Sequence, residues 1–276
     1  MRYKIIADSS VDIKGVDGIA FQCVPLKIIT AENEYVDNDE LDTHVMIEQL
    51  KKYKGKSHSS CPNSEEWRNS FEDYDGIICV TITSGLSGSY NAARVALEEY
   101  LEEFPQKRGF VIDSLSTGPE NALIVEKLCE LIDDGICFEE VEKQIREYMK
   151  TTHLVFCLES LKNLANNGRV SPAVAKIAGI LGIRIVGVAS SEGTLEISQK
   201  ARGAYRALQE IYKTMKDKGF CGGKIRIHHC NNESAAKELL EIIKTDFPNV
   251  CLQIGETGGL CSFYAEEGGL LVGFEG

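Results

Sequence analysis

The sequence is poor in positive charge. Its 276 residues carry 30 Lys and Arg against 42 Asp and Glu, which gives a formal net charge of −12 and an isoelectric point near 5.0. A surface of this sign does not attract the phosphates of nucleic acid or the head groups of an anionic membrane. Nucleic acid is therefore not an expected partner, and the charge mainly favours solubility.

Long apolar runs and paired cysteine motifs are also missing. No stretch approaches the roughly 20 apolar residues that cross a bilayer, and the N-terminus enters a strand without a signal-like region. Stable membrane insertion is not expected. No two of the ten cysteines have the CxxC spacing of a zinc or redox site. We expect buried free thiols and a cytoplasmic location, because five cysteines lie inside apolar runs: Cys79, Cys129, Cys157, Cys230 and Cys251.

The common cofactor and catalytic motifs are absent. The glycine-rich segment 219–224 leads into a strand and lacks a following Ser or Thr, so it predicts a turn and not a phosphate loop. No metal-ligand motif is present, and no metal or cofactor is expected. Segment 85–89 resembles the Gly-x-Ser-x-Gly turn of serine hydrolases, but its second glycine comes one residue early. His228 and His229 could supply a base to such a serine, although histidines at a strand end are more often an ordinary core or loop pair.

What the sequence does contain is a strand that breaks into a hydroxyl-rich turn and continues as a helix. Residues 77–82 are a short apolar run typical of a buried strand, and from Tyr90 the apolar residues follow one helix face. The turn between them is Thr83-Ser84-Gly85-Leu86-Ser87-Gly88-Ser89. Its glycines let a ligand approach the backbone, and the helix start, which Ser87 or Ser89 can cap, offers N–H groups to an anion. A simple cap and tight loop is the alternative.

Two other apolar strands end in polar groups. Asp8-Ser9-Ser10 follows the first strand, and Asp113-Ser114 follows residues 110–112. Ligands of open parallel sheets bind outside the carboxyl ends of the strands, so these three ends predict a polar rim for a ligand. No Lys or Arg stands in them. A carboxylate or single phosphate is therefore favoured over a polyphosphate.

The order of the expected elements predicts two domains. Strands and helices alternate as far as a strand at 154–158, which predicts a parallel-sheet α/β domain over residues 1–158. Pro25 confines one strand to an edge, Asp39 is expected to cap a helix, and Asn63 opens another with a capping box. A short helix over 158–166 and a second helix that starts at Ser171-Pro172 then precede a hairpin at 183–198 and a mixed series of strands and helices. Residues 159–276 are expected to form an α+β domain with a mixed sheet.

Taken together, several short segments resemble the DegV family. They follow the family's order over nearly the whole chain and comprise residues 8–10, 24–26, 59–62, 83–90, 112–114, 161–164, 168–171 and 268–270. The resemblance implies two domains with a long-chain fatty acid in a tunnel between them. It also implies a protein without catalysis of its own, which serves as the acyl-binding subunit for the ATP-dependent catalytic subunit of fatty acid kinase.

The resemblance also implies where the fatty acid carboxylate lies. Ser84 matches the binding serine of the family's Ser-Ser-x-Leu-Ser-Gly motif, and Gly85 and Ser87 belong to the same turn. Ser59 stands where a Thr-Ser-x-Pro motif has its binding threonine. Tyr264 falls in the register of a histidine near the C-terminus, and it can donate a hydrogen bond but stays neutral.

The same resemblance has implications for three further residues. Glu266 and Glu267 replace small residues of the family, and negative charge near a carboxylate would oppose binding unless both side chains point to solvent. Arg169 is the counterpart of a residue that faces the kinase partner. Because it follows Gly168 at a helix end, we expect its side chain at the surface, and we expect the carboxylate to be held without a cation.

Two other functions stay open on the sequence. One is a serine-dependent acyl hydrolase or transferase that uses Ser84 or Ser87 with His228 or His229. The other is a carrier of a different apolar carboxylate or an isoprenoid.

Overall fold

The first half of the chain builds a parallel four-stranded sheet. The computed structural model describes residues 2–72, 74–178 and 182–276. The sheet has the strand order β2-β1-β6-β7, with β1 at Tyr3–Asp8, β2 at Ala20–Val24, β6 at Gly76–Thr81 and β7 at Arg108–Asp113. All three pairings are parallel, as the alternation of strands and helices predicted.

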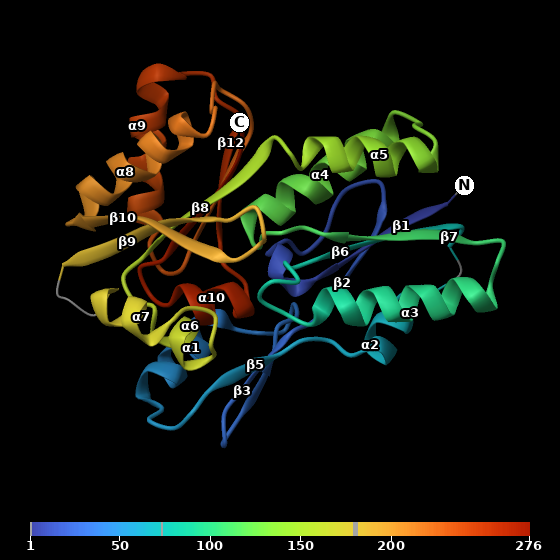
Figure 1. Cartoon of the computed structure of the whole chain (residues 1–276), viewed down its shortest axis with the longest axis horizontal. Helices are drawn as coiled ribbons and strands as arrows, with labels where there is room; N and C mark the ends of the chain where they lie inside the picture. Colours follow the sequence, from blue (N-terminus) through green and yellow to red (C-terminus); the bar gives the residue numbers. More distant parts are fainter. Residues whose placement is uncertain (1, 73, 179–181) are drawn as a thin grey trace.

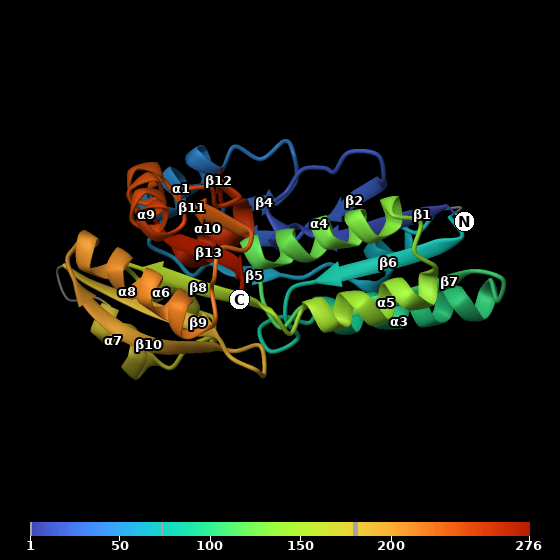
Figure 2. The same cartoon turned by 90° about the horizontal axis from the view of Figure 1, so that it is seen from above.

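Helices cover both faces of this sheet (Figure 1). One face packs against α3 (Ser89–Glu103) and α2 (Ser64–Arg68), and the other against α4 (Pro119–Asp133) and α5 (Phe138–Tyr148). Helix α4 also contacts β8 (Thr152–Leu158), β11 (Ile225–His229) and β13 (Leu270–Glu275) of the second sheet, as Figure 2 shows. This double packing explains why its sequence is apolar around much of its circumference.

A six-stranded sheet forms most of the second half. Its order is β10-β9-β8-β13-β11-β12. The bounds are Thr152–Leu158 for β8, Ile183–Ala189 for β9, Leu195–Arg202 for β10, Ile225–His229 for β11, Leu252–Glu256 for β12 and Leu270–Glu275 for β13. The β11–β12 pairing is parallel and the other pairings are antiparallel. Helices α8 (Ala204–Asp217) and α9 (Glu233–Asp246) pack on one face. The predicted fold class, a parallel α/β part followed by a mixed-sheet α+β part, is confirmed.

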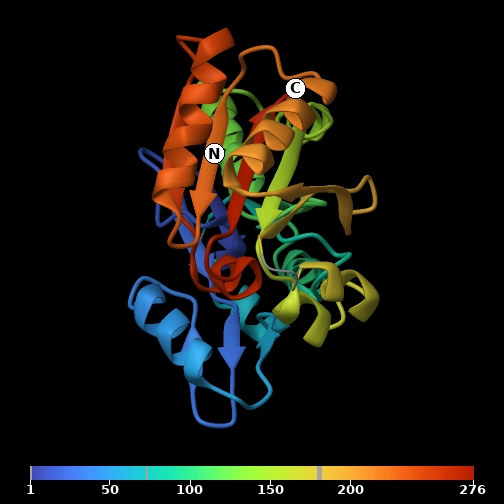
Figure 3. The same ribbon diagram turned by 90° about the vertical axis from the view of Figure 1, so that its left-hand side faces the viewer.

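A small third sheet lies at one end of the molecule (Figure 3). It has the order β4-β3-β5, with β3 at Lys27–Ile29, β4 at Glu34–Val36 and β5 at His58–Ser60. Helix α10 (Gly259–Ala265) lies against β3, and α1 (Thr43–Lys52), α6 (Lys162–Asn166) and α10 share one apolar cluster with the second sheet. The short helices η1 (Ser9–Val11) and α7 (Pro172–Ala178) complete the described elements.

The strand at 154–158 belongs to a different sheet from the one predicted. We expected it to close the parallel sheet, but β8 pairs antiparallel with β13 and β9. An apolar run of this kind can occupy the interior of either sheet, and its partner β13 lies more than a hundred residues later. The domain boundary after residue 158 stays a prediction, and the sheet membership of β8 favours a boundary before Thr152.

Two predicted helix caps are wrong. Asp42, and not Asp39, caps α1, because its side chain accepts a hydrogen bond from the Val45 N–H at 3.0 Å. Gly88, and not Ser87 or Ser89, is the N-cap residue of α3. The capping box of Asn63 and Glu66 is confirmed.

Pro25 separates β2, an edge strand of the parallel sheet, from β3 of the third sheet. The described residues contain no helix that is long and apolar enough to span a membrane.

The cysteines of the described residues are free. The expectation that Cys251 is buried is wrong, because Cys251 lies exposed just before β12, and Cys129 is half-buried.

Candidate functional site

An apolar cavity lies between the parallel sheet and the mixed sheet. Its volume is about 320 Å³, and it is lined by side chains from both halves of the chain. Most of them are aliphatic or aromatic, which is the usual composition of a site for a small apolar ligand. The apolar lining comprises Leu26, Ile82, Leu86, Leu154, Phe156, Leu158, Leu164, Leu195, Leu260, Ala265 and Leu271.

The cavity lining also contains polar side chains, which are Ser60, Thr117 and the four residues of a polar wall, Ser59, Ser87, Arg169 and Tyr264. The Oγ of Ser59, on β5, lies 2.7 Å from the hydroxyl of Tyr264, on α10. Ser87 and Arg169 line the cavity too, and the Arg169 guanidinium lies 5.7 Å from the centre of the Tyr264 ring. Burial raises the pKa of Tyr264, while Ser59 and the charge of Arg169 lower it. Because the pKa stays raised, Tyr264 is neutral at physiological pH and can donate to an anion.

The sequence led us to expect Arg169 at the surface, beyond the cavity. In the structure Arg169 is part of the cavity lining. Its Nε donates to the Leu86 carbonyl at 3.2 Å and one Nη donates to the Asn167 carbonyl at 2.7 Å. Gly168 has a positive φ of 75°, and the Arg169 N–H returns to the Leu164 carbonyl at 2.8 Å. This reversal turns the side chain toward the strand-to-helix turn. The expected position of Arg169, at the surface beyond the cavity, is therefore wrong, while the way in which a carboxylate is held stays a prediction.

Of the five residues predicted to bind the ligand, three line the cavity, namely Ser59, Ser87 and Tyr264. Ser84 and Gly85 are exposed and are not part of its lining. The Ser84 N–H donates to Asp113 at 2.9 Å, which fixes the turn from outside. Their direct contact with a ligand stays a prediction.

Of the three predicted polar strand ends, only the turn after β6 reaches the cavity; Asp8-Ser9-Ser10 and Asp113-Ser114 do not line it, and Asp8-Ser9-Ser10 holds the fold together. Asp8 is fully buried and accepts hydrogen bonds from the Ile82 N–H at 2.9 Å and from the Ser89 hydroxyl at 2.6 Å. Ser9 accepts from the Leu26 N–H at 3.0 Å, and Ser10 donates to Asp8 at 2.5 Å. A buried carboxylate requires such partners, and these bonds position three backbone segments that border the cavity.

The two glutamates that follow α10 point away from the cavity. Glu266 accepts hydrogen bonds from the Ser160 hydroxyl at 2.9 Å and from the Asn163 N–H at 3.1 Å, and Glu267 forms an ion pair with Lys51. Neither lines the cavity. Their charge is therefore directed to other partners and does not face the polar wall.

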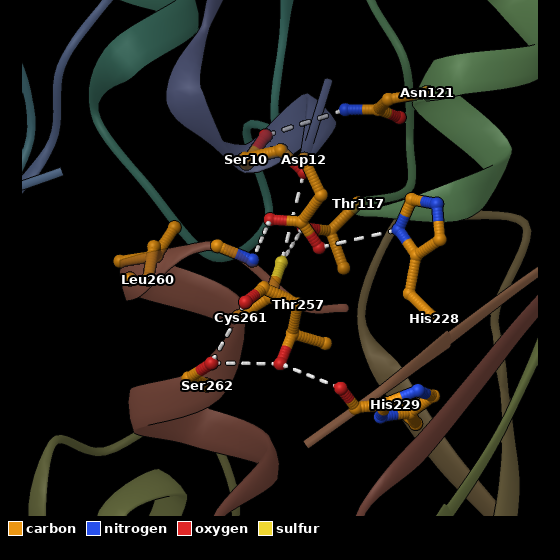
Figure 4. A network of polar contacts seen from close by, with 12 residues as sticks. Ser10, Asp12, Thr117, Asn121, His228, His229, Thr257, Leu260, Cys261 and Ser262 are labelled. Carbon is orange, nitrogen blue, oxygen red and sulfur yellow. Dashed lines mark hydrogen bonds and ion pairs between the residues drawn. The ribbon is translucent and has the colours of Figure 1, made fainter. Parts of the chain in front are cut away.

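The histidines lie elsewhere. The Nδ1 atom of His228 faces Asp12 at 3.4 Å in the polar network shown in Figure 4, and no histidine of the described residues lines the cavity. Among the described residues, therefore, no histidine is placed to act as a base for Ser87. Within the described ranges no group of His, Cys, Asp or Glu could hold a metal ion.

Sequence reasoning missed α10, which supplies Leu260, Cys261, Tyr264 and Ala265 to the cavity. Its start is typical of a loop in the sequence, because its first residue, Gly259, follows another glycine, Gly258. A signal was available in the apolar residues Leu260, Phe263 and Tyr264, which have helical spacing.

Comparisons with known proteins agree with this geometry. The family model described as "Uncharacterised protein, DegV family" matches residues 2–275. A DegV domain-containing protein of Streptococcus pneumoniae strain R6 is 44% identical over 279 residues, which cover 100% of this chain and 99% of the relative.

Two solved structures are similar over nearly their whole length. A DegV family protein from Eubacterium eligens, loaded with heptadecanoic acid, has a TM-score of 0.97 at 45% identity, covering 99% of both chains. The Streptococcus pneumoniae fatty acid kinase (Fak) B3 protein, loaded with linoleic acid, has a TM-score of 0.98 at 44% identity, covering 100% of this chain and 99% of that one. The chain belongs to the DegV family.

Proposed function

We propose that this protein buries a long-chain fatty acid in the cavity and presents the carboxylate to a separate ATP-dependent kinase subunit, which forms the acyl phosphate. The observation that carries the proposal is the division of one cavity into an aliphatic body and a polar wall of Ser59, Ser87, Arg169 and Tyr264. Similar proteins loaded with fatty acids support it.

The aliphatic body supplies the affinity. Each methylene removed from water contributes about 0.8 kcal/mol, so a long acyl chain gains far more than the head group does. Leu154, Phe156 and Leu158 on β8, with Leu271 on β13, provide a continuous apolar surface for it.

The polar wall fixes the orientation of the ligand. The Ser59 and Tyr264 hydroxyls lie in hydrogen-bonding contact, and a carboxylate beside them can accept from both. Arg169 adds a positive charge beside them. Gly88, next to Ser87, lines the cavity and is itself exposed, so the cavity comes close to the surface beside Ser87. A carboxylate held here is accessible to a second protein.

The protein itself needs no catalytic group, cofactor or nucleotide in this account, and we place it in the cytoplasm. A contact of Arg169 with the kinase subunit stays a prediction from the family motif. The hydrolase alternative is weakened by the position of His228, and labelling with a fluorophosphonate tests it: Ser84 and Ser87 should remain unmodified.

Native mass spectrometry of the purified protein, followed by organic extraction, tests the proposed ligand. We expect one bound molecule whose mass, after extraction, is that of a long-chain fatty acid. A protein that carries no lipid and takes up no oleic acid after delipidation would refute the proposal. Acyl phosphate formation from the loaded protein, ATP and a fatty acid kinase catalytic subunit tests the presentation step.

A further inference from the structure

Helix α10 begins against two buried carboxylates from the start of the chain. Asp37, which follows β4, accepts hydrogen bonds from the N–H groups of Gly259 at 2.6 Å and Leu260 at 2.9 Å. Asp12 accepts from the Gly258 N–H at 2.9 Å, and Figure 4 shows it beside the start of the helix. Three successive amides, which a helix start leaves without an internal partner, are thus held by two side chains.

The other end of α10 carries the polar group of the cavity. Tyr264 lies near the helix C-terminus and its hydroxyl contacts Ser59, while Leu260 and Cys261 line the cavity between the two ends. A helix of seven residues is too short to be stable by itself. The place of the Tyr264 hydroxyl therefore depends on what holds the start of the helix.

A cation site is the other function that these carboxylates suggest. Asp12 and Asp37 border a polar cleft of about 380 Å³ together with Asp39 and Glu256. Both oxygens of Asp37 and one oxygen of Asp12, however, accept from amides at the start of α10, the other oxygen of Asp12 faces His228, and no metal-binding group occurs among the described residues. The contacts therefore point to the helix as the partner of both side chains.

Holding Asp37 in this place has a cost. Burial, together with the neighbouring Asp12, raises the pKa of Asp37 to about 6, against the backbone hydrogen bonds from α10 that lower it. A buried charge beside a second carboxylate is unfavourable unless its hydrogen bonds compensate. The cost of burying Asp37 therefore indicates that the position of the α10 start matters to the protein.

We propose that Asp37, assisted by Asp12, is a positioning residue for the fatty acid head group: it fixes the start of α10 and thereby places the Tyr264 hydroxyl against Ser59. This inference rests on the proposed function, because it assigns Tyr264 to the ligand carboxylate. The positioning itself concerns the ligand-free protein, and it can be measured without any lipid.

The first test follows Tyr264 by NMR in protein whose tyrosines carry carbon-13 at the ring carbon bearing the hydroxyl. The Tyr264→Phe variant identifies the resonance by its loss. In ligand-free Asp37→Asn, which removes one of the two acceptors, we expect this resonance to move. Asp39→Asn changes an exposed carboxylate of the same cleft and serves as the matched control, so it should leave the resonance in place. An unmoved resonance in Asp37→Asn overturns the proposal.

The second test is a double-mutant cycle on oleic acid affinity. We expect Asp37→Asn and Tyr264→Phe each to weaken binding about 5- to 10-fold, the scale of one hydrogen bond. If Asp37 acts through Tyr264, the double variant should be weakened by at most about twofold beyond the weaker-binding single variant. Effects that multiply would mean that Asp37 acts on the fold in general, and would overturn the proposal.

Failure of the two ideas can be told apart. A protein that binds no fatty acid refutes the proposed function, while the tyrosine resonance still decides the positioning role.

If the Asp37→Asn variant does not fold, amide hydrogen exchange in the Tyr264→Phe variant replaces the NMR test. Because coupling is reciprocal, loss of the Tyr264 hydroxyl should speed exchange of the Gly259 and Leu260 amides, and unchanged exchange would overturn the proposal.

Discussion

The charge of Arg169 provides a sharp test of the polar wall. Arg169→Met removes the guanidinium and keeps an apolar stem of similar reach, so packing beside Tyr264 is largely retained. Of the five N–H donors of an arginine, the protein uses two, on the carbonyls of Leu86 and Asn167, which leaves others for a ligand carboxylate.

A hydrogen bond to a charged group contributes about 1.5–3 kcal/mol, and the partial exposure of Arg169 places the expected loss at the lower end of that range. We therefore expect palmitic acid to bind Arg169→Met about 10- to 30-fold more weakly than the wild type. Hexadecanol has the same chain without the carboxylate, and its affinity should be nearly unchanged. Isothermal titration measures both ligands, and Arg94→Met, an exposed arginine of α3, is the control.

Two results would refute this reasoning. Unchanged palmitic acid affinity would show that Arg169 does not meet the carboxylate, and would favour the docking role that the family motif implies. An equal loss for palmitic acid and hexadecanol would show that Arg169 contributes packing only.

Three further predictions follow from individual contacts. Ser59→Ala should weaken oleic acid binding by about 1–2 kcal/mol in isothermal titration, because the ligand carboxylate loses one of its hydroxyl donors, and an unchanged affinity would remove Ser59 from the site. Ser87→Ala should weaken binding and Ser84→Ala should not, since only the former lines the cavity; the reverse order would favour the motif over the geometry. Burial raises the pKa of Glu120 to about 7, so the folded state favours its neutral form, and this contribution to stability is complete below the unfolded pKa and is lost as the pH rises through about 7. Glu120→Gln should therefore lose less stability than the wild type between about pH 5 and pH 8 in urea unfolding, and identical pH profiles would contradict the assignment.

The parallel sheet and its helices could be predicted because their signals are local. The apolar run 77–82 and the helical spacing after Tyr90 each depend on a few neighbouring residues, and the capping box of Asn63 and Glu66 lies within four residues. Such features are visible in a short window of sequence.

The sheet to which β8 belongs and the direction of Arg169 could not be predicted in the same way. Strand β8 is almost fully buried, so nothing in residues 152–158 distinguishes one sheet from another, and its partner β13 is distant in sequence. Arg169 is turned inward by Gly168 and by the Leu86 carbonyl, which lies 83 residues earlier.

The start of α10 depends on contacts at still longer range. Its first amides bond to Asp37 and Asp12, which are separated from them by more than two hundred residues. The motif comparison brought Ser59 and Tyr264 to attention without such information, and the structure places them in hydrogen-bonding contact.

The central claim is that a fatty acid carboxylate lies at the wall formed by Ser59, Ser87, Arg169 and Tyr264. The most direct measurement is carbon-13 NMR of oleic acid labelled at its carboxyl carbon and added to the delipidated protein. We predict a single bound carboxyl resonance that moves in Ser59→Ala and in Arg169→Met but not in Arg94→Met. A bound resonance that none of these variants moves, or the resonance of free oleic acid alone, would contradict the account.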